Sequence, residues 1–209
     1  MRWPFTIAIV KSERLPLTQS PSKLITRPTS HAPALEIPPG LEVRNLPFKI
    51  GSGRTLATGV TMASGEERIR LRFFYRPLDG HLIGKVWFGE GADGPPGHVH
   101  GGASAYVLDE AMGSVGWMNH FPILAAHLDF DYLRPTPLMH DLSIEAWISE
   151  TRGLRITIRS RLMLDDKVCV EGRGEFAVIA RSKISQLADP SDPKVQELLN
   201  DTRLQWINE

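Results

Sequence analysis

Apolar and polar residues alternate in several segments of the chain after residue 67. An apolar side chain at every second position is typical of a strand that buries one face. We expect strands over residues 69–75, 82–88, 126–132, 142–148, 154–159 and 168–179. The turn sequence Pro77-Leu78-Asp79-Gly80 should join the first two as a hairpin.

One segment between these strands has a different pattern. Residues Ala103 to Met118 are apolar almost all round a helix, and only Asp109 and Glu110 are charged. A helix of this kind is buried rather than amphipathic. The order β-β-α-β-β-β-β therefore predicts an α+β fold, in which a largely antiparallel sheet wraps around one central apolar helix. Residues 194–207 predict a short C-terminal helix.

The N-terminal part is rich in proline, since eight of the 16 prolines lie between Pro4 and Pro47. Proline at this density prevents a long helix or a central strand. We therefore expect an arm over residues 1–65, a main domain over 66–182 and a tail with a short helix over 183–209. One interpretation is that the arm lies on the domain or on a partner subunit. The other is that it is a transit segment, which the excess of basic over acidic residues there would favour. We expect a cytoplasmic protein in the first case and one of an organelle matrix in the second.

Charge and cysteine content exclude several classes of function. The 24 basic and 24 acidic residues cancel, which argues against nucleic acid or an anionic membrane surface as a partner. No apolar run approaches the ~18 residues of a membrane span. The single cysteine, Cys169, rules out a disulfide framework and suits a reducing compartment.

The residues at the start of the central helix are candidates for a role in catalysis. Gly101 and Gly102 open this helix, where the first backbone amides have no partner within the helix and lie at the positive end of its dipole. Such amides can stabilise an oxyanion on an acyl carbon. Asp109 is the candidate base or nucleophile, because a carboxylate on a buried apolar helix should have a raised pKa. Glu110 lies about 100° around the helix and is expected to be structural.

The spacing between Gly101 and Asp109 predicts an oligomer. Asp109 follows Gly101 by eight residues, or ~12 Å of helix rise, so one carbonyl cannot contact both in the same chain. Two antiparallel helices across a two-fold axis would bring them together, which predicts a homodimer with two composite sites. His98 and His100 have no nearby Cys or Glu to complete a metal site, so we expect no metal. His100 either shapes the helix start locally, or positions an amide or polarises the substrate.

Two motifs resemble those of the hotdog-fold acyl-CoA thioesterases of the phenylacetic-acid-degradation (PaaI-like) type. They are His100-Gly101-Gly102 followed by Asp109, and the stretch from Asp129 to Leu138. The resemblance covers roughly residues 68–179. It implies a hydrolase of acyl-CoA in lipid or fatty acid metabolism that needs no metal or organic cofactor. It further implies that Asp109 is the catalytic carboxylate, that the Gly101 amide polarises the thioester carbonyl, and that dimers form, often paired into tetramers.

Substrate contacts follow from the same resemblance. We expect His98, His100 and Gly102 to contact substrate, and Arg134 is a candidate partner of the CoA phosphates. An apolar tunnel beside the helix should take the acyl group, with Trp117, Met118 and Phe121 as candidates that set its depth or are plain core.

The chain departs from the family pattern in three places. Gly94 stands where several members have Asn or Gln, Ala125 stands where some have Ser or Thr, and residues 59–65 lack cysteine. These departures leave room for an acyl-CoA-binding module without turnover. A second alternative is an enoyl-thioester hydratase that uses Asp93 and His98, whose spacing is that of hotdog hydratases.

Overall fold

A computed structural model describes residues 37–44, 60–61 and 67–207. The described residues form one seven-stranded sheet in the order β1-β2-β3-β5-β6-β7-β4, with every neighbouring pair antiparallel. The strands are β1 (Val60–Thr61), β2 (Glu67–Arg76), β3 (His81–Phe88), β4 (Ile123–Tyr132), β5 (Leu142–Arg152), β6 (Arg155–Leu164) and β7 (Lys167–Val178). The helical elements are η2 (Glu90–Ala92), α1 (Gly101–Met118), α2 (Arg181–Leu187) and α3 (Pro193–Asn200). The predicted order of six strands around one helix is confirmed, with the short β1 added at one edge.

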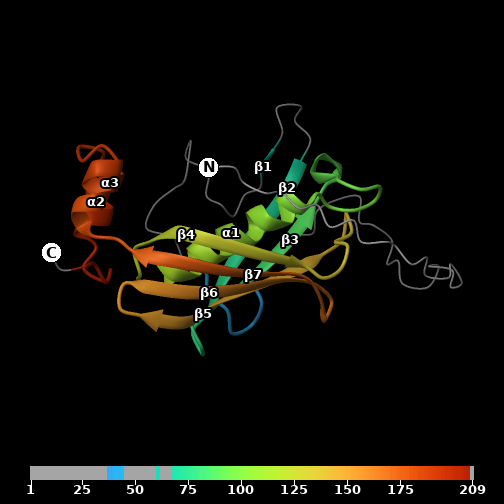
Figure 1. Ribbon diagram of the computed structural model, residues 1–209, viewed down its shortest axis with the longest axis horizontal. Helices are drawn as coiled ribbons and strands as arrows, with labels where there is room; N and C mark the ends of the chain where they lie inside the picture. The colour runs from blue at the N-terminus through green and yellow to red at the C-terminus, as the bar shows by residue number, and fades with distance from the viewer. Residues whose placement is uncertain (1–36, 45–59, 62–66, 208–209) are drawn as a thin grey trace, which may run out of the picture.

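The sheet curves around α1, as Figure 1 shows. Side chains of the sheet's concave face, among them Ile156, Ile158 and Leu162 of β6, are fully buried against the helix. Fully burying such a side chain stabilises the fold by about 1.5–3 kcal/mol. Gly116 lets β4 approach the helix closely, because a Cβ at this position would lie 2.1 Å from Cδ1 of Ile123.

The prediction that α1 is buried on every side is wrong for one stripe. Gly102, Ala105, Tyr106, Asp109 and Gly113 are only partly buried or exposed. Their spacing of three or four residues places them on one face of the helix. The rest of α1, apart from the partly buried Gly101 and Glu110, is packed into the core. The helix therefore offers one accessible face, and this face carries Asp109.

Strand β4 runs antiparallel to α1 and lies at the edge of the described sheet. Its first residue, Ile123, contacts the helix near Gly116, and its last, Tyr132, donates a hydrogen bond of 2.9 Å to the Gly101 carbonyl. Most of β4 is exposed, including Leu124 and Tyr132. The accessible face of α1 and an open strand edge thus belong to adjacent elements.

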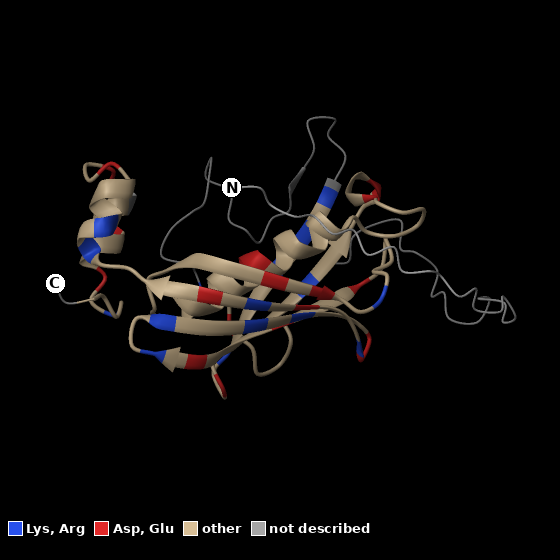
Figure 2. Cartoon of the chain, viewed as in Figure 1, with Lys and Arg blue, Asp and Glu red and all other residues tan. Residues whose placement is uncertain are grey.

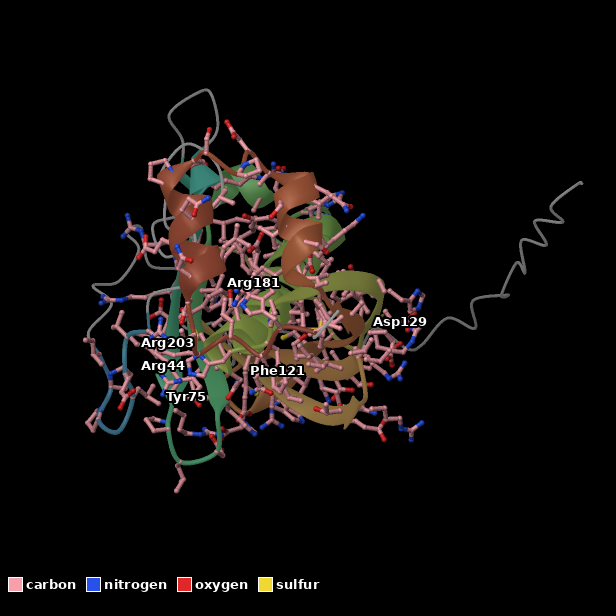
Figure 3. All side chains as sticks on the ribbon, turned by 90° about the vertical axis from the view of Figure 1, so that its left-hand side faces the viewer. Arg44, Tyr75, Phe121, Asp129, Arg181 and Arg203 are labelled. Carbon is pink, nitrogen blue, oxygen red and sulfur yellow. The ribbon has the colours of Figure 1, made fainter. Side chains whose placement is uncertain are left out.

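The C-terminal region contains two helices where one was predicted. Helix α3 ends at Asn200, and α2 precedes it. Backbone bonds tie the region to the core: Gln205 donates to His120 and Ile179 donates to Pro122, each at 2.8 Å. Figure 3, viewed from this end, labels Arg181 at the base of the two helices. Its guanidinium lies 5.7 Å from the ring of Trp206.

The predicted N-terminal arm falls largely outside the described residues. In the described piece 37–44, Glu42 exchanges two backbone hydrogen bonds of 2.8 Å with Tyr75 of β2. Arg44 lies over the Tyr75 ring at 3.5 Å and donates to the Met118 carbonyl at 3.0 Å, and Figure 3 labels this pair. This short piece therefore packs on the domain. No helix in the described residues is long and apolar enough to cross a membrane.

Candidate active site

The start of α1 is built around His100, which caps the helix. Its Nδ1 accepts a hydrogen bond of 3.0 Å from the Gly102 amide, and its own amide donates to Ala92 at 2.8 Å. The Gly102 amide is therefore already hydrogen-bonded to the capping side chain. Within residues 37–44, 60–61 and 67–207, the Gly101 amide has no partner. His100 thus fixes the helix start so that Gly101 offers the open donor.

Asp109 and Glu110 form the acidic part of the accessible face of α1. Figure 2 shows this acidic spot on a helix that carries no Lys or Arg. Both side chains are half-buried. Burial raises the pKa of Asp109 above its ordinary value. Burial, together with the nearby charge of Asp109, raises the pKa of Glu110 to about 7. A carboxylate with a raised pKa is a better proton acceptor near neutral pH, as a general base requires.

These carboxylates line a cavity of about 440 Å³. Its walls come from four parts of the chain: α1, the start of β4, the end of β7 and the α2–α3 pair. The lining residues are Asp109, Glu110, Gly113, Ser114, Trp117, Ile123, Leu124, Ala125, Phe176, Ile184, Leu187, Ala188, Val195 and Leu198. Besides the two carboxylates and Ser114, every lining residue is apolar or glycine. This composition suits an apolar ligand whose reactive group lies at the carboxylates.

The cavity tests the candidates for its depth. Trp117, a candidate either for setting the depth or for plain core, lines it. Met118 and Phe121 are not among the lining residues and instead pack in or against the core. Glu110 was expected to be structural but faces the cavity beside Asp109. Because the two residues are adjacent and both border the accessible stripe, a turn of 100° does not carry Glu110 out of the site.

The structure keeps Gly101 apart from Asp109 within one chain. Eight residues of helix separate them by ~12 Å, and Gly101 does not line the cavity. A single described chain therefore presents a carboxylate in an apolar cavity, and an open amide donor elsewhere on the same helix.

The other predicted substrate contacts also lie outside the cavity. His98 places Nδ1 2.9 Å from the Pro96 carbonyl. Arg134 is exposed and donates to the Val168 carbonyl at 2.6 Å. Asp93 is exposed and bridges to Val99 through its backbone. No cluster of three His, Cys, Asp or Glu residues suited to a metal occurs in the described part of the chain.

The departure at Gly94 has a steric cause. A Cβ at this position would lie 2.8 Å from the Cα of His100, so Asn or Gln does not fit this loop conformation. The departure at Ala125 leaves a methyl group in the cavity lining where a hydroxyl could have faced the carboxylates.

Sequence reasoning missed the C-terminal wall of the cavity. Five residues contribute to it. Ile184 and Leu187 lie in α2, Ala188 directly follows α2, and Val195 and Leu198 lie in α3. The signal was weak but present, because Ile184 and Leu187, like Val195 and Leu198, are three residues apart and so share a helix face.

Comparison with known proteins supports the resemblance. The family model for the thioesterase superfamily matches residues 96–172. The rat (Rattus norvegicus) protein named acyl-coenzyme A thioesterase THEM4 is 24% identical over 94 residues, which are 45% of this chain and 40% of that protein. The chain thus spans less than half the length of this relative.

Solved structures are also similar to this chain. The E. coli PaaI protein from the phenylacetic acid degradation operon is 16% identical, with a TM-score of 0.48, over 54% of this chain and 80% of its own. A crystal structure described as a thioesterase superfamily protein is 32% identical, with a TM-score of 0.50, over 52% of this chain and 53% of its own. The fold is therefore that of a hotdog domain, and its segment 96–172, which holds α1 and β4, is similar to the thioesterase superfamily.

Proposed function

We propose that this chain hydrolyses an acyl-CoA thioester to the free acid and CoA. The observation that carries the proposal is Asp109, a half-buried carboxylate with a raised pKa that lines an apolar cavity. The superfamily of residues 96–172 and the name of the rat relative support the same chemistry.

The reaction needs a base or nucleophile and an oxyanion donor. Asp109 takes a proton from water as the water oxygen bonds to the thioester carbon, or its own oxygen forms that bond first. The Gly101 amide stabilises the negative charge that develops on the carbonyl oxygen. In the first route the carbon–sulfur bond then breaks, and Asp109 returns its proton to the CoA sulfur. In the second route the CoA thiolate leaves behind an acyl anhydride on Asp109, which water then hydrolyses to the free acid and the restored carboxylate, and a proton of that water goes to the thiolate. No step calls for a metal or an organic cofactor.

Because Asp109 and Gly101 are too far apart in one chain, the proposal requires a homodimer with composite sites. The open edge of β4 and the accessible face of α1 are the surfaces that support it. An unpaired strand edge readily pairs with a second copy. Such a pair, with its two helices antiparallel, puts the Gly101 amide of one subunit beside Asp109 of the other. Further pairing into tetramers is compatible with this arrangement.

The need to bring Gly101 of one subunit to Asp109 of the other also sets the register in which the two β4 strands would pair. A helix rises about 1.5 Å per residue and a strand about 3.4 Å, so the eight residues from Gly101 to Asp109 match roughly 3.5 residues of β4. Since Tyr132 lies at Gly101, this spacing puts Asp109 at about the level of Leu128 or Asp129. The Gly101 of a second copy reaches Asp109 when its Tyr132 faces that point. The two-fold axis then passes close to Phe130.

Around this centre the remaining candidates have supporting roles. His100 is a positioning residue, because its cap leaves the Gly101 amide open. Arg134 is an exposed cation beyond the cavity and suits a CoA phosphate. The cytoplasm, or an organelle matrix if residues 1–65 act as a transit segment, stays a prediction.

The test measures CoA released from a panel of acyl-CoA substrates with a thiol reagent. Asp109→Asn should lower the rate by at least ~10²-fold, the usual contribution of a general base. Asp166→Asn, in the exposed turn between β6 and β7, is the matched control and should keep the wild-type rate. Equal rates for the wild type and Asp109→Asn would refute the role of Asp109.

The same assay separates the alternatives. An acyl-CoA-binding module, which the side chains missing at Gly94 and Ala125 favour, would bind tightly without releasing CoA. A hydratase would remove the enoyl absorbance and leave the thioester intact. Nothing in the cavity favours the second, because neither Asp93 nor His98 lines it.

A further inference from the structure

The cavity beside Asp109 is bordered by the two carboxylates, Asp109 and Glu110, at one end and by the C-terminal helices, α2 and α3, at the other. Between them the cavity follows α1 from Asp109 to Trp117, a helix rise of ~12 Å. The cavity is therefore elongated along α1, and longer than a single phenyl ring needs.

The far wall is apolar and offers no partner to a charged ligand. Its contributors are alanine or larger aliphatic residues of the C-terminal helices. Among the side chains that the structure describes, no Lys, Arg or His lines the cavity, while its two carboxylates repel a second negative charge. An acyl group with a terminal carboxylate would be desolvated here without a partner, which is costly. The lining therefore selects a neutral hydrocarbon chain.

Parts of the wall are anchored to the domain. Leu198 of α3 is 6% exposed and packs in the main core together with Leu204. The backbone bonds of Gln205 to His120 and of Ile179 to Pro122 fix the chain before α2 and after α3. The two helices contact each other, and Figures 1 and 3 show them together at the end of the molecule where β4 begins. Leu187 is 58% exposed, so it forms the outer rim of the wall.

We infer that α2 and α3 form the end wall of an acyl-chain pocket, and that Val195 and Leu187 set the longest aliphatic chain that the pocket accepts. This inference rests on the proposed thioesterase function and adds a substrate class to it, namely acyl-CoA with an uncharged aliphatic chain. The wall comes from residues 181–200, beyond the segment 96–172 that matches the superfamily.

The test measures binding rather than turnover. Non-cleavable 2-oxoalkyl thioethers of CoA, with chains from butyl to hexadecyl, are titrated into the full-length protein by calorimetry. Each methylene that enters the pocket should tighten binding by about fourfold, because burying it contributes ~0.8 kcal/mol. The gain should stop at the chain length that reaches α3.

Variants of the wall should move that limit. Val195→Phe should shorten the longest chain that still gains affinity, while Val195→Ala and Leu187→Ala should lengthen it. Glu197→Ala, on the exposed side of α3, is the matched control and should leave the limit unchanged. Circular dichroism checks that each variant is folded.

The outcomes separate this inference from the function on which it rests. An unchanged limit in all three wall variants, with binding otherwise intact, would overturn the role of the wall and leave the thioesterase proposal standing. Tighter binding of a phenylethyl or ω-carboxyalkyl analogue than of the octyl analogue would overturn the aliphatic assignment. No binding of any analogue would refute the proposed function as well.

Discussion

The Gly101 amide can be removed with little disturbance to the fold, which makes its proposed role directly testable. Proline at this position deletes the N–H and is well accepted at the first position of a helix. His100, the preceding residue, already has the extended conformation that proline requires, with φ −60° and ψ 134°. The added Cβ would lie 3.3 Å from Cε1 of Tyr132, so the ring must move by a few tenths of an ångström.

Gly101→Ala is the matched control, because it introduces the same Cβ and keeps the amide. The loss of one oxyanion donor lowers kcat by about 10²–10³-fold, equivalent to about 2.7–4 kcal/mol of transition-state stabilisation. Gly101→Pro should therefore be at least ~10²-fold slower than Gly101→Ala in CoA release. Melting curves should be similar for the two variants. Equal activity of the two would show that the amide is not the oxyanion donor.

Three further changes test the electrostatics and the packing by thermal melting. The pKa of Glu110 is raised from 4.5 to about 7 in the folded protein, so its contribution to stability is complete below pH 4.5 and is lost as the pH rises to about 7. Glu110→Gln should flatten this dependence of the melting temperature on pH. A decline with pH in the variant that parallels the wild type would contradict this. Burial alone would raise the pKa of Glu145, but hydrogen bonds from His81 and two arginines lower it below its ordinary value of 4.5. Glu145→Gln should therefore lower the free energy of unfolding at neutral pH by about 1–3 kcal/mol. In the wild type, the contribution of Glu145 to stability should be lost as the pH falls through the lowered pKa. A variant as stable as the wild type at neutral pH would be evidence against this. Ser160 has a buried hydroxyl without a partner among the described residues, so Ser160→Ala should be neutral or stabilising, and a loss above about 1 kcal/mol would show that the hydroxyl has a partner.

Local sequence patterns were sufficient for the central elements of the fold. Alternating residues placed the six main strands, and the uniformly apolar segment from residue 103 to 118 placed α1 within two residues of its observed start. These elements are long, and each repeats its pattern several times. Gly101 and Asp109 could be selected from the sequence because glycine at a helix start and a carboxylate on an apolar helix are both locally visible.

The remaining features depend on tertiary contacts. Helix α2 has only seven residues, too few for a helical period to stand out. The cavity combines Asp109 with Val195, 86 positions later in the chain, and no local pattern reports that pairing. Glycine at position 94 looks like a lost amide in the sequence. Only the position of the His100 backbone shows why a side chain is excluded there.

The central claim is that each active site combines Asp109 of one subunit with Gly101 of the other. It is tested most directly by mixing two inactive variants, Asp109→Asn and Gly101→Pro, unfolding them together, refolding them and measuring CoA release. A mixed dimer has one site with both defects and one intact site. Random pairing makes half of the dimers mixed, so the account predicts recovery to about a quarter of wild-type activity. If each site used one chain alone, every site in every dimer would carry a defect, and the mixture would stay as inactive as its components.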